Sequence, residues 1–251
     1  MRYFLSIAAS DTSSGAGIQQ DLKMAEKLGF WSLSVISALT SQNFSKISGI
    51  EIVNPIFFKD QLDIIFDSFD ISAVKIGVIP TIEIALILRK YLDKSKYPIV
   101  FDPVIKSSSN YDLMKDDPVE IIEILSSLST VTTPNIPEFE YLIKKDINDN
   151  SLKEIFNRYK SEYFYIKGGH SIQDTIQEYL ISINMMKKYE YQRFNWEYTH
   201  GTGCAFSSLL SMYLIDNDIE VACVKAREML VEVFTSIARK YNHVYYPSVR
   251  N

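Results

Sequence analysis

The sequence predicts an α/β protein with a doubly wound, mostly parallel central sheet that is flanked by helices. Two observations lead to this prediction. Short apolar runs, typical of strands buried on both faces, alternate with amphipathic segments almost throughout the chain. Polar residues and glycines follow one apolar run after another, as at the carboxyl ends of parallel strands, where such sheets bind ligands. No low-complexity linker, charge block or internal repeat divides the chain, so we expect residues 1–251 to form a single domain.

The first two thirds of the chain give the parallel part of the sheet. Apolar runs predict strands at Tyr3–Ala9, Trp31–Leu39, Ala73–Ile79, Ile99–Phe101, Thr130–Thr132 and Tyr163–Ile166. Amphipathic spacing predicts helices between them at Ile18–Leu28, Phe57–Phe69, Ile82–Leu92, Pro118–Leu128 and Leu152–Tyr159. In the second of these helices, Leu62, Ile65, Phe66 and Phe69 share one stripe. This alternation of strands and helices is typical of a doubly wound sheet.

The pattern changes after Lys167. Thr175–Ile183 and Lys188–Trp196 read as an antiparallel pair of strands. Two long helices, Thr202–Ile215 and Ile219–Tyr241, follow them.

Composition limits the classes of partner. Asp and Glu outnumber Lys and Arg by 31 to 26, and the net charge of −5 offers no surface for nucleic acid or anionic membranes. A small-molecule partner is therefore expected. The two cysteines provide no disulfide framework, and no apolar run approaches the length of a membrane span. These features, and an N-terminal apolar run too short for a signal peptide, predict a cytoplasmic protein.

The most informative stretch is Thr199-His200-Gly201-Thr202-Gly203-Cys204, which directly precedes a helix-forming run. Two glycines let successive N–H groups point the same way, and a helix N-terminus adds unpaired amides and the positive end of its dipole. We therefore expect an anion-binding turn with a thiol at its rim. A thiolate is favoured at such a position, so Cys204 is expected to have a depressed pKa and to act as a base or nucleophile. The alternative is an ordinary loop capped by Thr202, with Cys204 as a small buried residue.

Other candidates lie at neighbouring strand ends. Ser14-Gly15-Ala16-Gly17 opens a helix but lacks the full dinucleotide-binding spacing, and Asp21, one turn later, is expected either to accept a substrate hydroxyl or to stabilise the helix. The amide of Gln42 offers a donor beside an acceptor, which suits the edge of an aminopyrimidine. The alternative for Gln42 is a solvated loop residue.

Oxygen ligands form a further group. Asp102 ends a strand, and Asn135 and Glu138 lie at a junction of strand and helix; such residues suit Mg²⁺ or, for the last two, a helix cap. Lys167-Gly168-Gly169-His170 places a cation and a flexible backbone where phosphates bind, or else forms a glycine-rich turn. The chain has no Walker A loop and no paired zinc motif. A cysteine protease with His200 as the partner of Cys204 is poorly supported.

Taken together, several motifs resemble the hydroxymethylpyrimidine and hydroxymethylpyrimidine phosphate kinases of thiamine biosynthesis. They occur in the family's order and span nearly the whole chain: residues 8–11 and 15–23, 34–43, Val74-Lys75-Ile76-Gly77, Asp102-Pro103-Val104, residues 133–138, residues 167–170 and residues 199–204. The resemblance implies a ribokinase-like fold, ATP and Mg²⁺ as cofactors, and transfer of the γ-phosphoryl group to a pyrimidine hydroxymethyl and then to its monophosphate. Relatives are often dimers, so a homodimer is expected.

The resemblance also implies roles for individual residues. It assigns Cys204 to the position of the catalytic base and Gly201, Thr202 and Gly203 to the migrating phosphoryl group. The pyrimidine substrate is assigned to Gln42, Asp21, Val104, Val78 and Gly17. The nucleotide is assigned to Lys167, Gly169, Thr199 and His200, and the metal with its waters to Asp102, Asn135 and Glu138.

The chain departs from the family pattern at a few positions. It has Ala9 and Ser14 where the family has glycine, and Val78 where the family has methionine. Ser108-Ser109-Asn110 replaces a Lys-Ser-Gly lid, which puts lid closure and the second phosphorylation in doubt; Lys106 is a candidate for the missing cation. Two other functions stay open. A pyridoxal kinase also phosphorylates a hydroxymethyl group on a ring, and a non-catalytic pyrimidine-binding protein would keep only the pocket.

Overall fold

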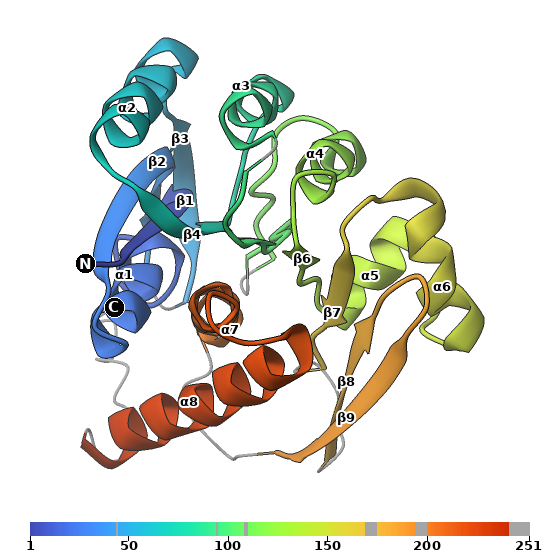
Figure 1. Cartoon of the computed structure of the whole chain (residues 1–251). Coiled ribbons are helices and arrows are strands. Elements are labelled where there is room, and N and C mark those ends of the chain that lie inside the picture. The colour runs from blue at the N-terminus through green and yellow to red at the C-terminus, as the bar shows by residue number, and fades with distance from the viewer. Residues whose placement is uncertain (44, 94, 108–109, 169–174, 194–199, 241–251) are drawn as a thin grey trace.

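The computed structural model describes residues 1–43, 45–93, 95–107, 110–168, 175–193 and 200–240. Within them, one sheet has the strand order β3-β2-β1-β4-β5-β6-β7-β8-β9 (Figure 1). The strands are β1 (Tyr3–Ser10), β2 (Trp31–Gln42), β3 (Ile47–Ile52), β4 (Ile71–Ile76), β5 (Ile99–Phe101), β6 (Val131–Thr132), β7 (Tyr163–Ile166), β8 (Thr175–Ile181) and β9 (Met186–Gln192). All pairs from β2 to β7 are parallel, whereas β3, β8 and β9 pair antiparallel. The predicted doubly wound, mostly parallel sheet is confirmed.

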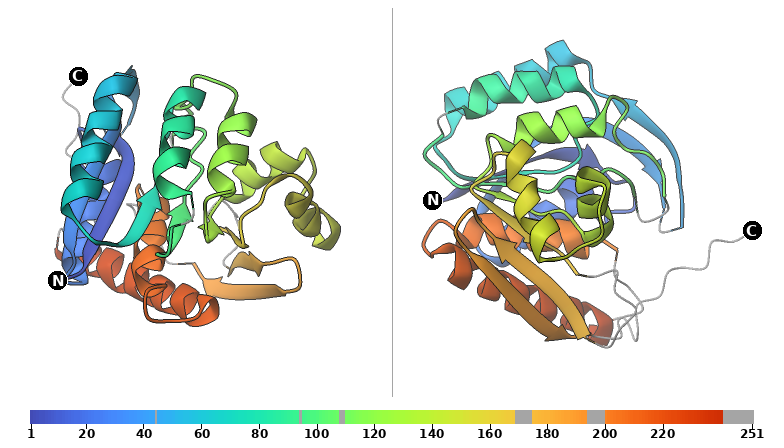
Figure 2. Two further views of the ribbon diagram at one scale, coloured as in Figure 1. Left: turned by 45° about the horizontal axis from the view of Figure 1, so that its top comes forward. Right: turned by 90° about the vertical axis from the view of Figure 1, so that its right-hand side faces the viewer.

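Helices cover both faces of the sheet (Figures 1 and 2). One layer consists of α2 (Pro55–Ser68), α3 (Ile82–Leu92), α4 (Pro118–Ser126), α5 (Ile136–Ile143) and α6 (Asp149–Arg158). The other consists of α1 (Gly17–Lys27), α7 (Thr202–Tyr213) and α8 (Ile219–Lys240). Each layer buries its own apolar cluster against the sheet. Two cores of this size supply the main stabilisation of the fold.

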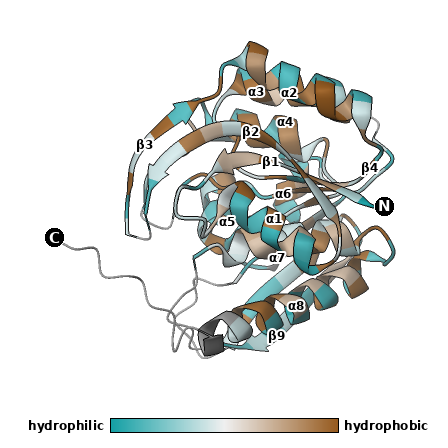
Figure 3. Ribbon diagram, turned by 90° about the vertical axis from the view of Figure 1, so that its left-hand side faces the viewer, coloured by the Kyte–Doolittle hydropathy of each residue, from teal (hydrophilic) through white to brown (hydrophobic). Residues whose placement is uncertain are grey.

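Local sequence signals explain where several helices begin. The side chains of Asn54, Thr81 and Asp117 each accept a hydrogen bond from the first turn of α2, α3 and α4. A proline follows Asn54 and Asp117 directly, at a position where its missing N–H costs no helical bond. In Figure 3, hydrophobic and hydrophilic residues are mixed along α2, whose Ile56 and Phe57 are exposed. No helix in the described ranges is long and apolar enough to cross a membrane.

The structure adds one strand to the elements predicted and gives the bounds of the helix expected after Asn135. The strand β3 lies at the edge of the sheet and is only partly buried, so it has no apolar run to mark it. The helix α5 begins at the cap formed by Asn135 and is only eight residues long. In addition, β4 ends at Ile76 rather than Ile79, because the chain turns into a loop at Gly77.

The strand order also defines a crevice. From β1 the chain proceeds to β2 on one side of the sheet, and it later returns to β4 on the other side of β1. The segments that follow β1 and β4 therefore diverge at their carboxyl ends, which is where open α/β sheets bind ligands.

Candidate active site

A pocket of about 980 Å³ lies at the carboxyl ends of the parallel strands. Most of the site residues predicted from the sequence line it: Gly17, Gln42, Val78, Asp102, Val104, Asn135, Glu138, Lys167, His200, Gly201, Thr202, Gly203 and Cys204. Gly169 and Thr199, both predicted to bind the nucleotide, fall outside the described residues, as do Ser108 and Ser109 of the lid. The fold thus gathers segments that are far apart in the sequence into one pocket.

The glycine turn, Gly201–Cys204, forms the start of α7. Gly201 is the N-cap residue and has φ of 81°, a left-handed conformation that favours glycine. A Cβ at this position would lie 1.8 Å from the carbonyl oxygen of Gly15, so only glycine fits between the two loops. No side chain caps this helix at Gly201, and its first turn contains no acidic residue. The N-terminus of α7 therefore meets the pocket with its positive end.

The Cys204 thiol lies in the first turn of α7, but its predicted depressed pKa is wrong. Burial raises the pKa of Cys204 to about 11, and the carboxylates of Asp102 and Asp21 add to the rise. The ammonium of Lys75 and a backbone hydrogen bond from Gly17 oppose it without reversing it. In this structure Cys204 is therefore a protonated thiol at neutral pH.

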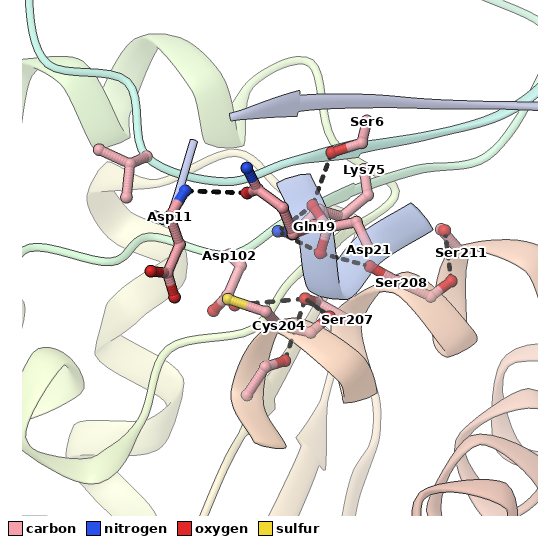
Figure 4. Close-up of polar contacts among 12 residues, drawn as sticks. Ser6, Asp11, Gln19, Asp21, Lys75, Asp102, Cys204, Ser207, Ser208 and Ser211 are labelled. Carbon is pink, nitrogen blue, oxygen red and sulfur yellow. Dashed lines mark hydrogen bonds and ion pairs between the residues drawn. The ribbon is translucent and has the colours of Figure 1, made fainter. Parts of the chain in front are cut away.

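Asp21 is also placed differently from the prediction. It is fully buried and does not line the pocket. Its oxygens accept hydrogen bonds from Lys75 Nζ at 2.8 and 2.9 Å, from Ser6 Oγ at 2.6 Å and from Ser208 Oγ at 2.8 Å (Figure 4). These donors occupy the carboxylate. The prediction that Asp21 accepts a substrate hydroxyl is therefore wrong. Asp21 instead joins β1, β4, α1 and α7 beneath the pocket.

Lys75 is the cation that compensates the buried charge of Asp21. Burial alone would lower the pKa of Lys75, but Asp21, Cys204 and Asp102 together outweigh burial and raise it above its ordinary value, with Asp21 as the largest of the three. The ammonium also interacts electrostatically with Cys204 and Asp102. A lysine inside the apolar run of β4 was the sequence signal for a buried ion pair, because lysine is almost never fully buried without a partner.

A second group of charges lies where β5, β7 and α5 meet. Asp102 is buried and contacts Lys167 Nζ on one oxygen and Ser207 Oγ, at 3.2 Å, on the other. Asn135 and Glu138 form a capping box, in which each side chain accepts a hydrogen bond of 2.8 Å from the other's backbone N–H. Burial raises the pKa of Glu138 to about 7, an effect that Lys167 opposes and Asp102 reinforces.

The chemistry of these residues fits a hydrated Mg²⁺. Within the described part of the chain, no group of three or more His, Cys, Asp or Glu residues is arranged to hold a metal by itself. Mg²⁺ does not need such a cage, since it retains several waters and uses one or two carboxylates together with substrate phosphates. Asp102 and Glu138 both line the pocket, and the charge of Asp102 raises the pKa of Glu138, so two acids are available there for an ion of this kind.

Part of the pocket lining is an apolar wall that includes Ala9, Val78, Val104 and Leu113. Ala9, Ala38, Val78 and Leu113 form a small buried cluster, against which Val104 packs. Gln42 lines the same pocket and pairs across β2 and β3 with Ile47, which packs against the cluster. Gly17, with φ of 56°, brings the start of α1 close to Ala9. A planar ring with one polar edge matches such walls.

Sequence reasoning missed Asp11. This buried carboxylate accepts hydrogen bonds from the backbone N–H groups of Ser13, Gly15 and Ala16 and lies 3.3 Å from His200 Nε2. An aspartate two residues before a serine is a signal for an Asx turn. No local signal joins Asp11 to His200, which is 189 positions away.

An open α/β sheet whose pocket combines an apolar wall, a helix N-terminus in a glycine turn and two acids beside a lysine is the arrangement of a small-molecule kinase. Comparison with known proteins makes the class specific. Residues 11–247 match the family model of phosphomethylpyrimidine kinase, and the chain belongs to that family.

Two curated relatives illustrate the match. The bifunctional thiamine biosynthesis protein ThiED of Geobacter sulfurreducens is 36% identical over 85% of this chain, which spans 45% of the length of that relative. The hydroxymethylpyrimidine/phosphomethylpyrimidine kinase of Aquifex aeolicus is 32% identical over 91% of this chain and 92% of its own length.

Solved structures share the ribokinase-like fold. Phosphomethylpyrimidine kinase from Clostridium difficile superposes with a TM-score of 0.78 at 32% identity, covering 93% of this chain and 99% of its own. An ADP complex of Bacillus subtilis pyridoxal kinase superposes with a TM-score of 0.80 at 26% identity, covering 91% and 90%. The use of ATP follows from membership of a kinase family.

Proposed function

We propose that this chain transfers the γ-phosphoryl group of ATP to the hydroxymethyl group of 4-amino-5-hydroxymethyl-2-methylpyrimidine, and then to the resulting monophosphate, in thiamine biosynthesis. The observation that carries the proposal is that one pocket is lined by Gln42, by the apolar wall and by the glycine turn of α7. The names of the family and of its relatives support this choice of substrate.

The chain's own residues account for the main requirements of the reaction. Phosphoryl transfer depends chiefly on holding donor and acceptor in line and on neutralising charge at the equatorial oxygens. The amides at Gly203 and Cys204 and the ammonium of Lys167 serve the second need. A Cβ at Gly203 would stand 3.3 Å from Lys167 Nζ, so the turn and the cation lie side by side.

Cys204 is proposed to accept the proton of the substrate alcohol late in the transfer. Because the resting thiol is protonated, it must release its proton to the solvent in the open pocket before it can accept the proton of the alcohol. Lys75 is a cation whose field favours that ionisation. Asp102, Asn135 and Glu138 would hold Mg²⁺ through its waters, and the ion would supply charge neutralisation at the phosphates.

Two alternatives make different predictions. A pyridoxal kinase is favoured by the close superposition of the Bacillus subtilis enzyme. Against it, Gln42 suits the amino group and ring nitrogen of the pyrimidine, and pyridoxal lacks that amino group. A non-catalytic binding protein would not need the glycine turn, Cys204 and the acidic residues together. A homodimer, a cytoplasmic location, a single domain and the absence of a nucleic-acid partner stay predictions.

A coupled assay of ADP release separates these functions. We expect turnover with the hydroxymethylpyrimidine and its monophosphate that greatly exceeds turnover with pyridoxal. Turnover with pyridoxal alone would replace the proposed substrate, and no release with any of the three would refute the kinase proposal.

A further inference from the structure

A hairpin between β5 and α4 borders the pocket beside its apolar wall. Ser107 N donates a hydrogen bond to Tyr111 O at 2.9 Å, and Leu113 N donates to Ile105 O at 3.0 Å. Leu113 belongs to the small apolar cluster of the wall, and Tyr111 packs against that cluster. Lys106 lies between Ile105 and Ser107 and lines the pocket. Lys106 is therefore next to the wall that is proposed to receive the pyrimidine.

Lys106 is held less firmly than other cations of the pocket. Its Nζ lies 3.3 Å from Asp112 Oδ1, and the two side chains are 50% and 68% exposed. Exposed ion pairs contribute little to stability, so the exchange of Asp112 for another anion has a small cost. By contrast, Lys75 and Lys167 each contact a buried carboxylate. Lys106 is thus a cation that can turn from a surface carboxylate to a ligand in the pocket.

The second phosphoryl transfer of the proposed function needs a further cation. Its acceptor is a phosphate monoester, which carries a charge of roughly −1.5 to −2 at pH 7. One oxygen of this group forms a bond to the γ-phosphorus of ATP. The bond from the γ-phosphorus to the oxygen of the β-phosphate breaks, and ADP leaves with the electron pair. No proton has to be removed from an ionised oxygen, so the main obstacle is repulsion between two anionic phosphates.

We propose that Lys106 binds the phosphate group of the monophosphate and thereby determines whether the chain carries out the second transfer. Lys167 lies beside Gly203 of the glycine turn, so its charge serves the migrating phosphoryl group. A cation next to the pyrimidine wall serves the acceptor instead. The ammonium of Lys106 exchanges the Asp112 carboxylate for phosphate oxygens. The first transfer does not need this contact, because its acceptor is an uncharged alcohol.

The inference rests on the proposed function and is tested by comparing its two acceptors. The readout is the kcat/KM for the monophosphate divided by the kcat/KM for the hydroxymethylpyrimidine, from initial rates of ADP release on one preparation. Lys106→Met removes the charge, and the ratio should fall roughly fivefold or more because a charge-assisted hydrogen bond is lost with the monophosphate only. Lys106→Arg keeps the charge and should recover most of the ratio. A smaller fall in Lys106→Met would overturn the inference.

Asp112→Asn separates phosphate binding from a structural role of the ion pair. This variant breaks the same ion pair but keeps the ammonium of Lys106, so the ratio should stay at the wild-type value or rise. If the ion pair served only to shape the hairpin, the ratio would fall equally in Asp112→Asn and Lys106→Met. That result would overturn the inference.

Lys115→Met is the matched control for the loss of one positive charge. Lys115 follows the same hairpin, is exposed and lies with its Nζ 4.8 Å from the centroid of the Tyr111 ring. It is not among the described residues that line the pocket, so the ratio should stay within about twofold of wild type. An equal fall in Lys115→Met and Lys106→Met would contradict the assignment.

The failures of the two proposals are distinguishable. Failure of the wild-type chain to phosphorylate the hydroxymethylpyrimidine would refute the proposed function. A wild-type chain that phosphorylates the hydroxymethylpyrimidine but not its monophosphate would leave the first transfer in place and overturn the role of Lys106.

Discussion

Substituting Gly201 by alanine should abolish most of the turnover, because of where the new methyl group would lie. Its Cβ would stand 1.8 Å from the carbonyl oxygen of Gly15, and Cβ atoms essentially never approach other atoms closer than 3.0 Å. The glycine turn and the loop before α1 must therefore separate by more than about 1 Å. A displacement of this size at a reacting centre lowers rates by about 100-fold.

Gly29→Ala provides the matched control for this experiment. Gly29 has φ of 75°, close to the 81° of Gly201, yet a Cβ at Gly29 would meet nothing within 4 Å. Both substitutions carry the strain of a left-handed alanine, about 1 kcal/mol, but only one moves the pocket. We expect kcat of Gly29→Ala to stay within threefold of wild type in the ADP-release assay, with a modest drop in Tm. A Gly201→Ala enzyme as active as Gly29→Ala would refute the role given to the turn.

Three further predictions concern the pocket and the ion pair of Asp21 and Lys75 beneath it. Cys204→Ala should lower kcat strongly and leave pyrimidine affinity nearly intact, as measured by calorimetry; a variant with most of its turnover would remove Cys204 from the base role. With the pKa of Cys204 at about 11, roughly one thiol in ten thousand is ionised at pH 7. The rate of Cys204 alkylation by iodoacetamide should therefore rise about tenfold per pH unit from pH 7 to 10. A rate that levels off below pH 8 would contradict the raised pKa. Lys75→Met leaves the Asp21 carboxylate buried without its cation and should lower the free energy of unfolding in urea by about 3 kcal/mol. Part of that loss should be recovered in Lys75→Met/Asp21→Asn. Equal stability of the wild type and the two variants would refute a stabilising role for the ion pair beneath the pocket.

The parallel core of the fold was predictable because its strands are buried on both faces and appear as apolar runs. Val74 and Ile76 of β4, for example, are fully buried. The strand β3 could not be found in this way, since an edge strand with one face in solvent needs fewer apolar residues. Gly49 within it further weakened the pattern.

The residues of the candidate site were predictable where a polar or charged side chain lies at the end of a strand. Gln42, Asp102 and Lys167 each follow or end a strand, and parallel topology brings strand ends to one edge of the sheet. The pKa of Cys204 was not predictable, because the helix N-terminus is visible in the sequence but the burial that outweighs it is a property of the packed structure.

The remaining wrong or missing predictions concern residues whose contact partners are far away in the sequence. Asp21 lies on the face of α1 that meets Lys75, 54 positions away, and its place one turn into the helix gave no indication of that partner. The same holds for Asp11 and His200. Pairs of this kind depend on which strands become neighbours, information that the order of residues alone does not carry.

The most direct test of the kinase account is a crystal structure of the chain with the pyrimidine substrate and a non-hydrolysable ATP analogue. The account predicts that the terminal phosphate lies within hydrogen-bonding distance of the backbone N–H groups of Gly203 and Cys204, with the substrate hydroxyl in line beyond it and the ring edge at Gln42. A terminal phosphate bound elsewhere, with the glycine turn directed away from it, would contradict the account.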